Sequence, residues 1–308
     1  MSYAVLFPGQ GSQSVGMGAD VFAQRPDLLG GAAEATLGWS LERLVAEGPE
    51  DDLTQTDKAQ PALYGVAYAL WSEFSEAVSA APSAAAGHSL GEYTALAAAG
   101  ALDFQAGLGL VAARGRAMQV CAEAADSAMA ALLGADVETA EAFTELRRRE
   151  GGHLWVANIN APGQIVVAGG AEDIIWAVAN GRDHGVRRVI PLKVAGAFHS
   201  PYMAAAAEAL SGALEEIRFG EPAFPVYANV TAEPVIDIAA NLALQLVSQV
   251  RFADSLVAMA GIGITTFVHI GPGNVTATMA KRTVKDAVVL SVSSRADIDD
   301  VVKKLAVQ

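Results

Sequence analysis

A serine between two glycines is the pattern in this chain with the clearest chemistry. Gly87-His88-Ser89-Leu90-Gly91 follows the small apolar run Ala84 to Ala86 and precedes a helix-forming stretch from Glu92 to Ala99. A strand, a tight turn and a helix in this order predict a nucleophile elbow, with the helix N-terminus pointing at the serine oxygen. The glycines permit the strained turn, and the N–H of Leu90 can donate to an oxyanion. The pattern therefore favours catalysis through an acyl-serine.

A serine hydroxyl needs a base, and the five histidines are the candidates. His88 adjoins the serine, but a turn sends neighbouring side chains apart, so we expect it to support the elbow by packing or hydrogen bonding. His153 and His184 lie in polar stretches typical of solvated loops, and His269 ends an apolar strand, where it could face the site or fill the strand end. His199 lies in a break between a strand and a helix, where catalytic groups collect. It is either the base or a loop histidine with satisfied hydrogen bonds.

Arg114 is expected on a helix from about 104 to 122, in the middle of an apolar stripe. The stripe consists of Gly107, Leu110, Met118 and Cys121. A guanidinium on this stripe needs an anion. An internal ion pair or a side chain that extends to solvent is the simpler interpretation, and a bound anionic substrate is the other.

Six short segments, taken in order, resemble one enzyme family. They are Phe7 to Gln13, Gly87 to Tyr93, Arg114 to Gln119, Asn160 to Gln164, Gly196 to Ser200 and Gly271 to Asn274. At these separations the chain resembles the malonyl-CoA:acyl carrier protein transacylases of fatty acid synthesis and the acyltransferase domains of polyketide synthases. The resemblance runs from residue 3 to about 295.

The resemblance implies a role for each matching residue. Ser89 becomes the nucleophile and His199 its base, which returns the proton to the departing CoA sulfur and later deprotonates the phosphopantetheine thiol. In this family a backbone carbonyl orients the histidine by accepting a hydrogen bond from it, and Gln245 matches the residue that supplies this carbonyl. The backbone N–H groups of Gln10 and Leu90 are implied to form the oxyanion hole. The usual proline near Gln245 is replaced by Gln249, which is a departure from the family pattern.

The same resemblance narrows the substrate. Arg114 is implied to bind the free carboxylate of a malonyl group, a contact worth about 1.5–3 kcal/mol, or roughly a 10- to 150-fold preference over an uncharged acyl chain. Leu90 and Phe198 resemble the residues of malonyl-selective members, because Phe198 would fill the space that an α-methyl group needs. Simple core packing is the alternative for both.

The order of the predicted elements indicates an α/β protein. Between about 128 and 195 the expected order is β-α-β-β-α-β, the split pattern of a ferredoxin-like unit. We therefore predict an inserted ferredoxin-like subdomain at 128–195 and a large catalytic domain with a hydrolase-like parallel sheet at 1–127 and 196–308, with the site between them. The expected helices are 14–24, 61–79, 90–99, 103–124, 138–149, 171–180, 201–216, 253–260 and 274–285.

Composition limits the location and the partners. The formal charge of −14 disfavours nucleic acid and anionic membranes. No apolar run approaches a membrane span, and no basic leader precedes the first strand, so we expect a cytoplasmic protein. We separately expect it to work as a monomer. The single cysteine, Cys121, excludes an internal disulfide and a cysteine metal cluster, and its helix position predicts a small core residue. We expect no tightly bound cofactor and no metal.

The implied partner is an acyl carrier protein that brings its own phosphopantetheine, with malonyl-CoA as the acyl donor. Carrier proteins are expected to be acidic, so docking needs a local basic area. The candidates are Arg187, Arg188 and Lys193 in the small domain and Lys281, Arg282 and Lys285 near the C-terminus. Scattered solvating charge is the alternative for each. A serine acyl-CoA hydrolase or thioesterase, or a subunit serving a malonate decarboxylase carrier, is the alternative function, and the sequence leaves the pathway open.

Overall fold

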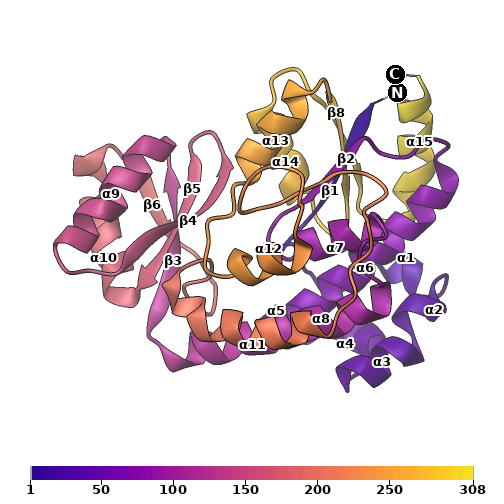
Figure 1. The fold of residues 1–308 in the computed structure, drawn as a ribbon, viewed down its shortest axis with the longest axis horizontal. Helices are drawn as coiled ribbons and strands as arrows, with labels where there is room; N and C mark the ends of the chain where they lie inside the picture. Colours follow the sequence, from indigo (N-terminus) through magenta and orange to yellow (C-terminus); the bar gives the residue numbers. More distant parts are fainter. Residues whose placement is uncertain (1, 308) are drawn as a thin grey trace.

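The computed structural model describes residues 2–307, which contain a five-stranded and a four-stranded β-sheet (Figure 1). In spatial order the larger sheet consists of β7 (Val226–Tyr227), β2 (Ala84–Gly87), β1 (Tyr3–Phe7), β8 (Thr266–Ile270) and β9 (Val288–Val292). The smaller consists of β4 (Leu154–Ala161), β5 (Gln164–Gly170), β3 (Ser127–Leu133) and β6 (Arg188–Pro191). We call each sheet with its helices the large and the small body.

The helices follow the chain in three groups. Before the small sheet come α1 (Ala19–Phe22), α2 (Pro26–Leu29), α3 (Gly31–Leu37), α4 (Leu41–Glu47), α5 (Glu50–Thr54), α6 (Thr56–Ala77), α7 (Gly91–Ala98) and α8 (Phe104–Ala124). Within it come α9 (Val137–Arg149), α10 (Ala171–Asn180) and the 3-10 helix η1 (Gly181–His184). After it come η2 (Pro201–Met203), α11 (Ala204–Glu215), α12 (Ile238–Gln245), α13 (Phe252–Gly261), α14 (Val275–Thr283), η3 (Arg295–Asp297) and α15 (Ile298–Ala306). Among the described residues, no helix has the length and apolar character that a bilayer crossing requires.

The large sheet is parallel, and all its strands except the edge strand β9 are buried on both faces. Along β1, Tyr3, Val5 and Phe7 join the main core, which α6 and α8 supply. The alternate residues Ala4 and Leu6 pack in a second cluster with side chains of α13 and α14. Because successive strand residues face opposite ways, β1 can be apolar throughout and still serve two helix layers.

The small sheet is antiparallel, and its strand order is that of a ferredoxin-like fold. α9 and α10 cover one of its faces (Figure 1), and Phe143 and Ile174 from these helices share a core with Leu132 and Val167. Its strands run from Ser127 to Pro191, one residue outside the predicted start of the insertion. The α/β class and the two sheet types agree with the sequence prediction, and the domain boundaries stay a prediction.

The two bodies are joined by shared packing as well as by the chain. Asn158 of β4 forms a parallel bridge with Val250, which precedes α13. Val166 of the small sheet belongs to the main core, and Ala253 of α13 belongs to the core of the small body. These contacts place β4 and β5 directly beside the large body, so the cleft between the bodies has a fixed wall.

The N-terminal part of the helix prediction was wrong. The expected helix 14–24 is present only from Ala19 to Phe22, because Gly16 and Gly18 adopt positive φ angles of 88° and 63° that a helix excludes. The short helices α3, α4 and α5 were not predicted, nor were α12 and α15. For α15 the signal is in the sequence, since Ile298, Val301 and Leu305 are spaced for one helix face and are buried.

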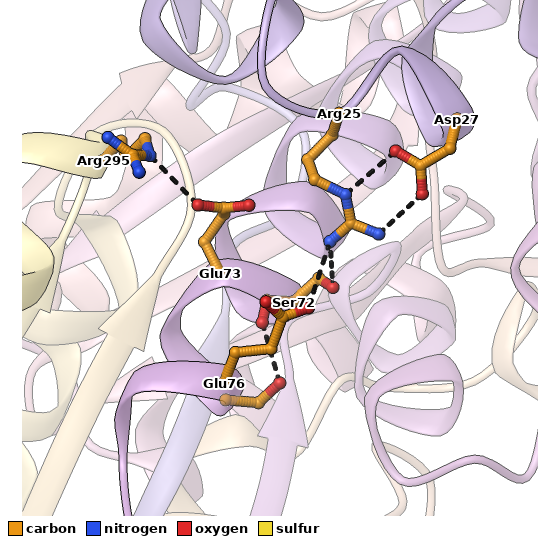
Figure 2. A network of polar contacts seen from close by, with 7 residues as sticks. Arg25, Asp27, Ser72, Glu73, Glu76 and Arg295 are labelled. Carbon is orange, nitrogen blue, oxygen red and sulfur yellow. Dashed lines mark hydrogen bonds and ion pairs between the residues drawn. The ribbon is translucent and has the colours of Figure 1, made fainter.

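A polar network ties the two ends of the large body to α6 (Figure 2). Arg25, which precedes α2, donates to Asp27 at 3.0 and 2.7 Å and also reaches Ser72 of α6. Arg295 of η3 donates to Glu73 of α6 at 3.0 Å. The hydrogen-bonded ion pair between the two side chains raises the pKa of Arg25 and lowers the pKa of Asp27. The network contains none of the candidate catalytic residues. It holds α6, a helix that supports the site, in place.

Candidate active site

The predicted elbow is present between β2 and α7. Ser89 has a φ of 51°, in the left-handed region that non-glycine residues seldom adopt. A Cβ atom at Gly87 would lie 1.8 Å from the carbonyl carbon of Gly91, and one at Gly91 would lie 2.3 Å from the carbonyl oxygen of Phe7. Both glycines are therefore required by close backbone contact, and together they force the serine side chain out of the turn.

Ser89 and His199 meet across 110 residues of sequence. The serine Oγ lies 2.8 Å from Nε2 of the histidine, whose Nδ1 lies 2.9 Å from the carbonyl oxygen of Gln245. A carbonyl only accepts, so Nδ1 carries the proton and Nε2 is the free acceptor for the serine hydroxyl. Burial, and then the positive charge of Arg114, lower the pKa of His199 to about 3. At neutral pH the imidazole is thus an uncharged base.

Arg114 is fully buried and points into the same site. It donates to Gln60 Oε1 at 2.7 Å, to Gln245 Oε1 at 2.9 Å and to the Oγ of Ser89 at 3.1 Å. Its Nε has no partner, and its guanidinium lies 5.3 Å from the ring centre of Tyr93. No carboxylate within residues 2–307 forms an ion pair with it. The interpretation of Arg114 as an internal ion pair or a side chain that reaches solvent is therefore wrong.

A pocket of about 250 Å³ opens over these residues. It is lined by the predicted residues Gln10, Leu90 and Phe198 together with the serine, the histidine and the arginine, whereas Gln245 lies behind its wall. In residues 2–307 we find no hydrogen-bond acceptor for the backbone N–H of Gln10 or of Leu90. Met129 of β3 and Met279 of α14 complete the lining from the small body and from the second helix layer. The pocket is thus shared between the two bodies.

A serine paired with a neutral histidine, a buried cation and two free N–H groups in one pocket can perform acyl transfer to and from an anionic acyl group. The model of the acyl transferase domain family matches residues 5–305. The chain belongs to this family.

Family members of known name match nearly the whole chain. A malonyl CoA-acyl carrier protein transacylase of Bacillus subtilis (strain 168) is 40% identical over 307 residues, 98% of this chain and 96% of the relative. A solved acyl-carrier-protein S-malonyltransferase of Burkholderia pseudomallei 1710b is 37% identical, with a TM-score of 0.93 and coverage of 98% and 100%. A malonyl-transacylase in complex with its type II PKS acyl-carrier protein is 35% identical, with a TM-score of 0.93 and coverage of 99% and 100%. The fold of this acyl transferase is that of its relatives.

The other histidines of this acyl transferase are structural or exposed. His88 is turned from the serine toward Asn160, with Nε2 2.7 Å from the amide oxygen. His269 fills the end of β8, where Nδ1 lies 2.6 Å from Thr276 Oγ1 and Nε2 lies 3.0 Å from the carbonyl oxygen of Gly271. Burial lowers the pKa of both side chains, that of His269 to about 4. The exposed histidines are His153 and His184.

Sequence reasoning missed a polar layer beneath the elbow. Asn229, just beyond β7, accepts from the Ser89 N–H at 2.7 Å and donates to the Gly87 carbonyl at 2.7 Å. Its own N–H donates to Glu92 at 3.1 Å, and Asn241 donates to the same carboxylate at 2.5 Å. The signal for Glu92 was present, since it is the one charged residue in the helix that follows the serine. Asn229 carries no comparable signal, because its partners are distant in sequence.

Proposed function

We propose that this chain transfers a malonyl group from malonyl-CoA to the phosphopantetheine thiol of an acyl carrier protein through a malonyl-serine intermediate. The observation that carries the proposal is Arg114, a buried cation without a carboxylate partner in residues 2–307 that reaches the serine Oγ at 3.1 Å. An anionic acyl group would supply the carboxylate that this cation lacks, whereas an uncharged acyl group would not. The names of the relatives at 35–40% identity support the same reaction.

In the first half-reaction, Oγ of Ser89 attacks the thioester carbonyl as Nε2 of His199 takes its proton. The Gln245 carbonyl accepts from Nδ1 and stabilises the imidazolium that forms. The N–H groups of Gln10 and Leu90 donate to the carbonyl oxygen as it becomes negative. When the carbon–sulfur bond breaks, His199 returns the proton to the CoA sulfur, and the malonyl-serine remains.

The second half-reaction runs through the same atoms in reverse. His199, neutral again, takes the proton of the phosphopantetheine thiol, and the thiolate attacks the malonyl-serine carbonyl. The serine oxygen leaves and regains the proton from Nε2. One base therefore serves both steps, and because its pKa is low, His199 is neutral and able to accept a proton at the start of each step.

The acyl group is selected at its far end. The malonyl carboxylate would replace the Ser89 Oγ contact of Arg114, whose remaining donors stay fixed by Gln60 and Gln245. A guanidinium already held in place loses little side-chain entropy when it binds a carboxylate. Phe198, buried beside the catalytic histidine, bounds the space on the thioester side and disfavours an α-branch.

The carrier would dock where basic residues flank the pocket. Lys193 lies between Leu192 and Val194, which both line the pocket. Lys281 lies in the last turn of α14, the helix that supplies Met279 to the lining, and Lys285 follows just beyond this helix. Within the described residues none of these lysines forms an ion pair. A carrier at this position could thread its phosphopantetheine arm into the pocket.

The proposal is tested by incubating the protein with malonyl-CoA and a phosphopantetheinylated carrier, with the acyl-enzyme and the carrier followed by mass spectrometry. We expect a malonyl adduct on Ser89 that appears on the carrier faster than free malonate is released. Ser89→Ala should form no adduct, because the elbow, residues 87–91, carries no other hydroxyl group. Malonate release that keeps pace with transfer would instead indicate a hydrolase.

A further inference from the structure

Glu92 is a fully buried carboxylate one helical turn beyond the nucleophile, and it touches none of the reacting atoms. We propose that it is a positioning residue, whose ionised carboxylate fixes the side-chain amide of Gln245 and through it both Ser89 and Arg114. This inference rests on the malonyl transfer proposed above and adds a residue to its machinery.

The partners of Glu92 show that it acts as a carboxylate. Gln245 Nε2 donates to Oε2 at 2.7 Å, the N–H of Asn229 donates to the same oxygen at 3.1 Å, and Asn241 Nδ2 donates to Oε1 at 2.5 Å. All three are donors, and an ionised carboxylate is acceptor-only. A protonated acid would direct its own O–H at one of them. The three contacts therefore favour the charged form despite its burial.

Gln245 connects Glu92 to the site. Its Oε1 accepts from Arg114 at 2.9 Å, its Nε2 donates to the Ser89 carbonyl at 3.0 Å, and its backbone oxygen lies 2.9 Å from Nδ1 of His199. If the amide were flipped, its NH₂ would face the guanidinium and its oxygen would face the carboxylate of Glu92 and the serine carbonyl. Glu92 thus holds the amide in the only orientation that satisfies both charged neighbours.

The charge of Glu92 also has a purpose. It forms no direct ion pair with Arg114, and the Gln245 amide lies between the two, with its oxygen toward the cation and its nitrogen toward the anion. Burial raises the pKa of Glu92 to about 7, while the three hydrogen bonds and the charge of Arg114 oppose the rise. A buried charge is costly, and here three donors offset the cost; an apolar residue would leave these donors without an acceptor, and an amide would turn its own NH₂ toward them.

The test is Glu92→Gln, which keeps the shape and replaces an acceptor with an NH₂ that faces donors. We expect kcat/KM for malonyl transfer to fall roughly 10- to 100-fold, as for the loss of a charged hydrogen bond. Acetyl transfer, which does not use Arg114, should fall less, so the malonyl-to-acetyl ratio decreases. The exposed Glu208→Gln on α11 is the charge-matched control and should change neither rate. Equal losses for both acyl groups would indicate a purely structural role and overturn the proposal.

A double-mutant cycle examines the route through Gln245. Gln245→Ala removes the amide and keeps the backbone carbonyl, so Glu92→Gln should add almost nothing to it if the carboxylate acts through that amide. Losses that multiply would overturn the proposal.

If Glu92→Gln does not fold, Asn241→Ala, which removes the donor to Oε1, should lower the same ratio more weakly. An unchanged ratio in that variant would also reject the proposal. A wild-type protein without malonyl transfer would reject the proposed function itself, whereas an active wild type matched by Glu92→Gln would reject only the role of Glu92.

Discussion

At the scale of the residue, the site works because burial and one positive charge hold a histidine neutral. Burial is the larger cause of the low pKa of His199, and Arg114 is the second. The same arginine that would bind the acyl carboxylate therefore also tunes the base. Arg114 and His199 both form hydrogen bonds with the Oγ of Ser89. Substrate recognition by the arginine and the pKa of the base are therefore coupled.

This coupling predicts the pH dependence of acylation. The neutral imidazole is the active form, so protonation of His199 lowers activity only as the pH falls through its folded pKa of about 3, and the titration of this base causes no break near 6.5. Arg114→Ala removes one cause of the shift and raises the pKa of His199, which moves the acid limb to higher pH. The comparison is made with acetyl-CoA, which lacks the carboxylate. Superimposable acid limbs would contradict the coupling.

Arg114→Ala should also change acyl selectivity. Malonyl transfer is expected to fall roughly 10- to 150-fold, the cost of a hydrogen bond to a charged group, while acetyl transfer holds or rises. Steady-state kcat/KM for the two CoA esters, with the thermal midpoint of each variant recorded beside it, provides the measurement. A common loss for both esters would mean that the arginine only holds α8 in place.

At the scale of the element, the elbow is fixed by backbone contact. Gly91→Ala would place a Cβ 2.3 Å from the Phe7 carbonyl oxygen, so β1 and α7 must separate. We expect a loss of about 1–3 kcal/mol in unfolding free energy, as for overpacking, and a slower acylation. Gly212→Ala on α11 is the control, because its Cβ meets nothing within 4 Å and should stabilise the helix by about 0.5–1 kcal/mol. Urea unfolding compares the two, and equal stabilities would contradict the strained turn.

The elements that the sequence predicted well are those with a strong local pattern. α8 was expected at 103–124 and runs from Phe104 to Ala124, where the Asp103 side chain caps it by accepting from the Ala106 N–H at 2.9 Å. The serine and its turn were also predicted, because their pattern is local. The short helix α12, which ends at Gln245, was missed. The polar layer of Glu92 and its partners was not predicted, because it joins residues that are 137 to 153 positions apart in the sequence.

At the scale of the whole molecule, net charge and local charge act in opposite directions. The chain has a formal charge of −14, yet exposed basic residues without ion pairs in the described structure lie beside the pocket on both bodies. Arg282 also spans the two bodies, since it donates to Gln164 Oε1 at 3.1 Å and to the Pro162 carbonyl at 3.2 Å. It is therefore structural in part, and Lys281 at the end of α14 and Lys285 just beyond it are the cleaner probes of docking.

The positive charges of Lys281 and Lys285 are expected to attract the carrier. Lys281→Glu with Lys285→Glu should raise the KM for an acidic carrier by roughly threefold to tenfold, because local attraction must overcome the net repulsion at encounter. Transfer to free pantetheine should hardly change, since Ser89 and His199 are untouched. Lys303→Glu on α15, which lies at the opposite end of the molecule from the small sheet in Figure 1, is the control for Lys281→Glu alone, since each of these variants reverses one charge.

Added salt discriminates further, because it screens the attraction in the wild type and the repulsion in the reversed variant, so the two KM values should converge. An unchanged carrier KM in the variant that combines Lys281→Glu and Lys285→Glu, with a rise in Arg187→Glu and Arg188→Glu, would move the docking surface to the small body. The carrier would then approach the same pocket from the side of β6 instead of α14.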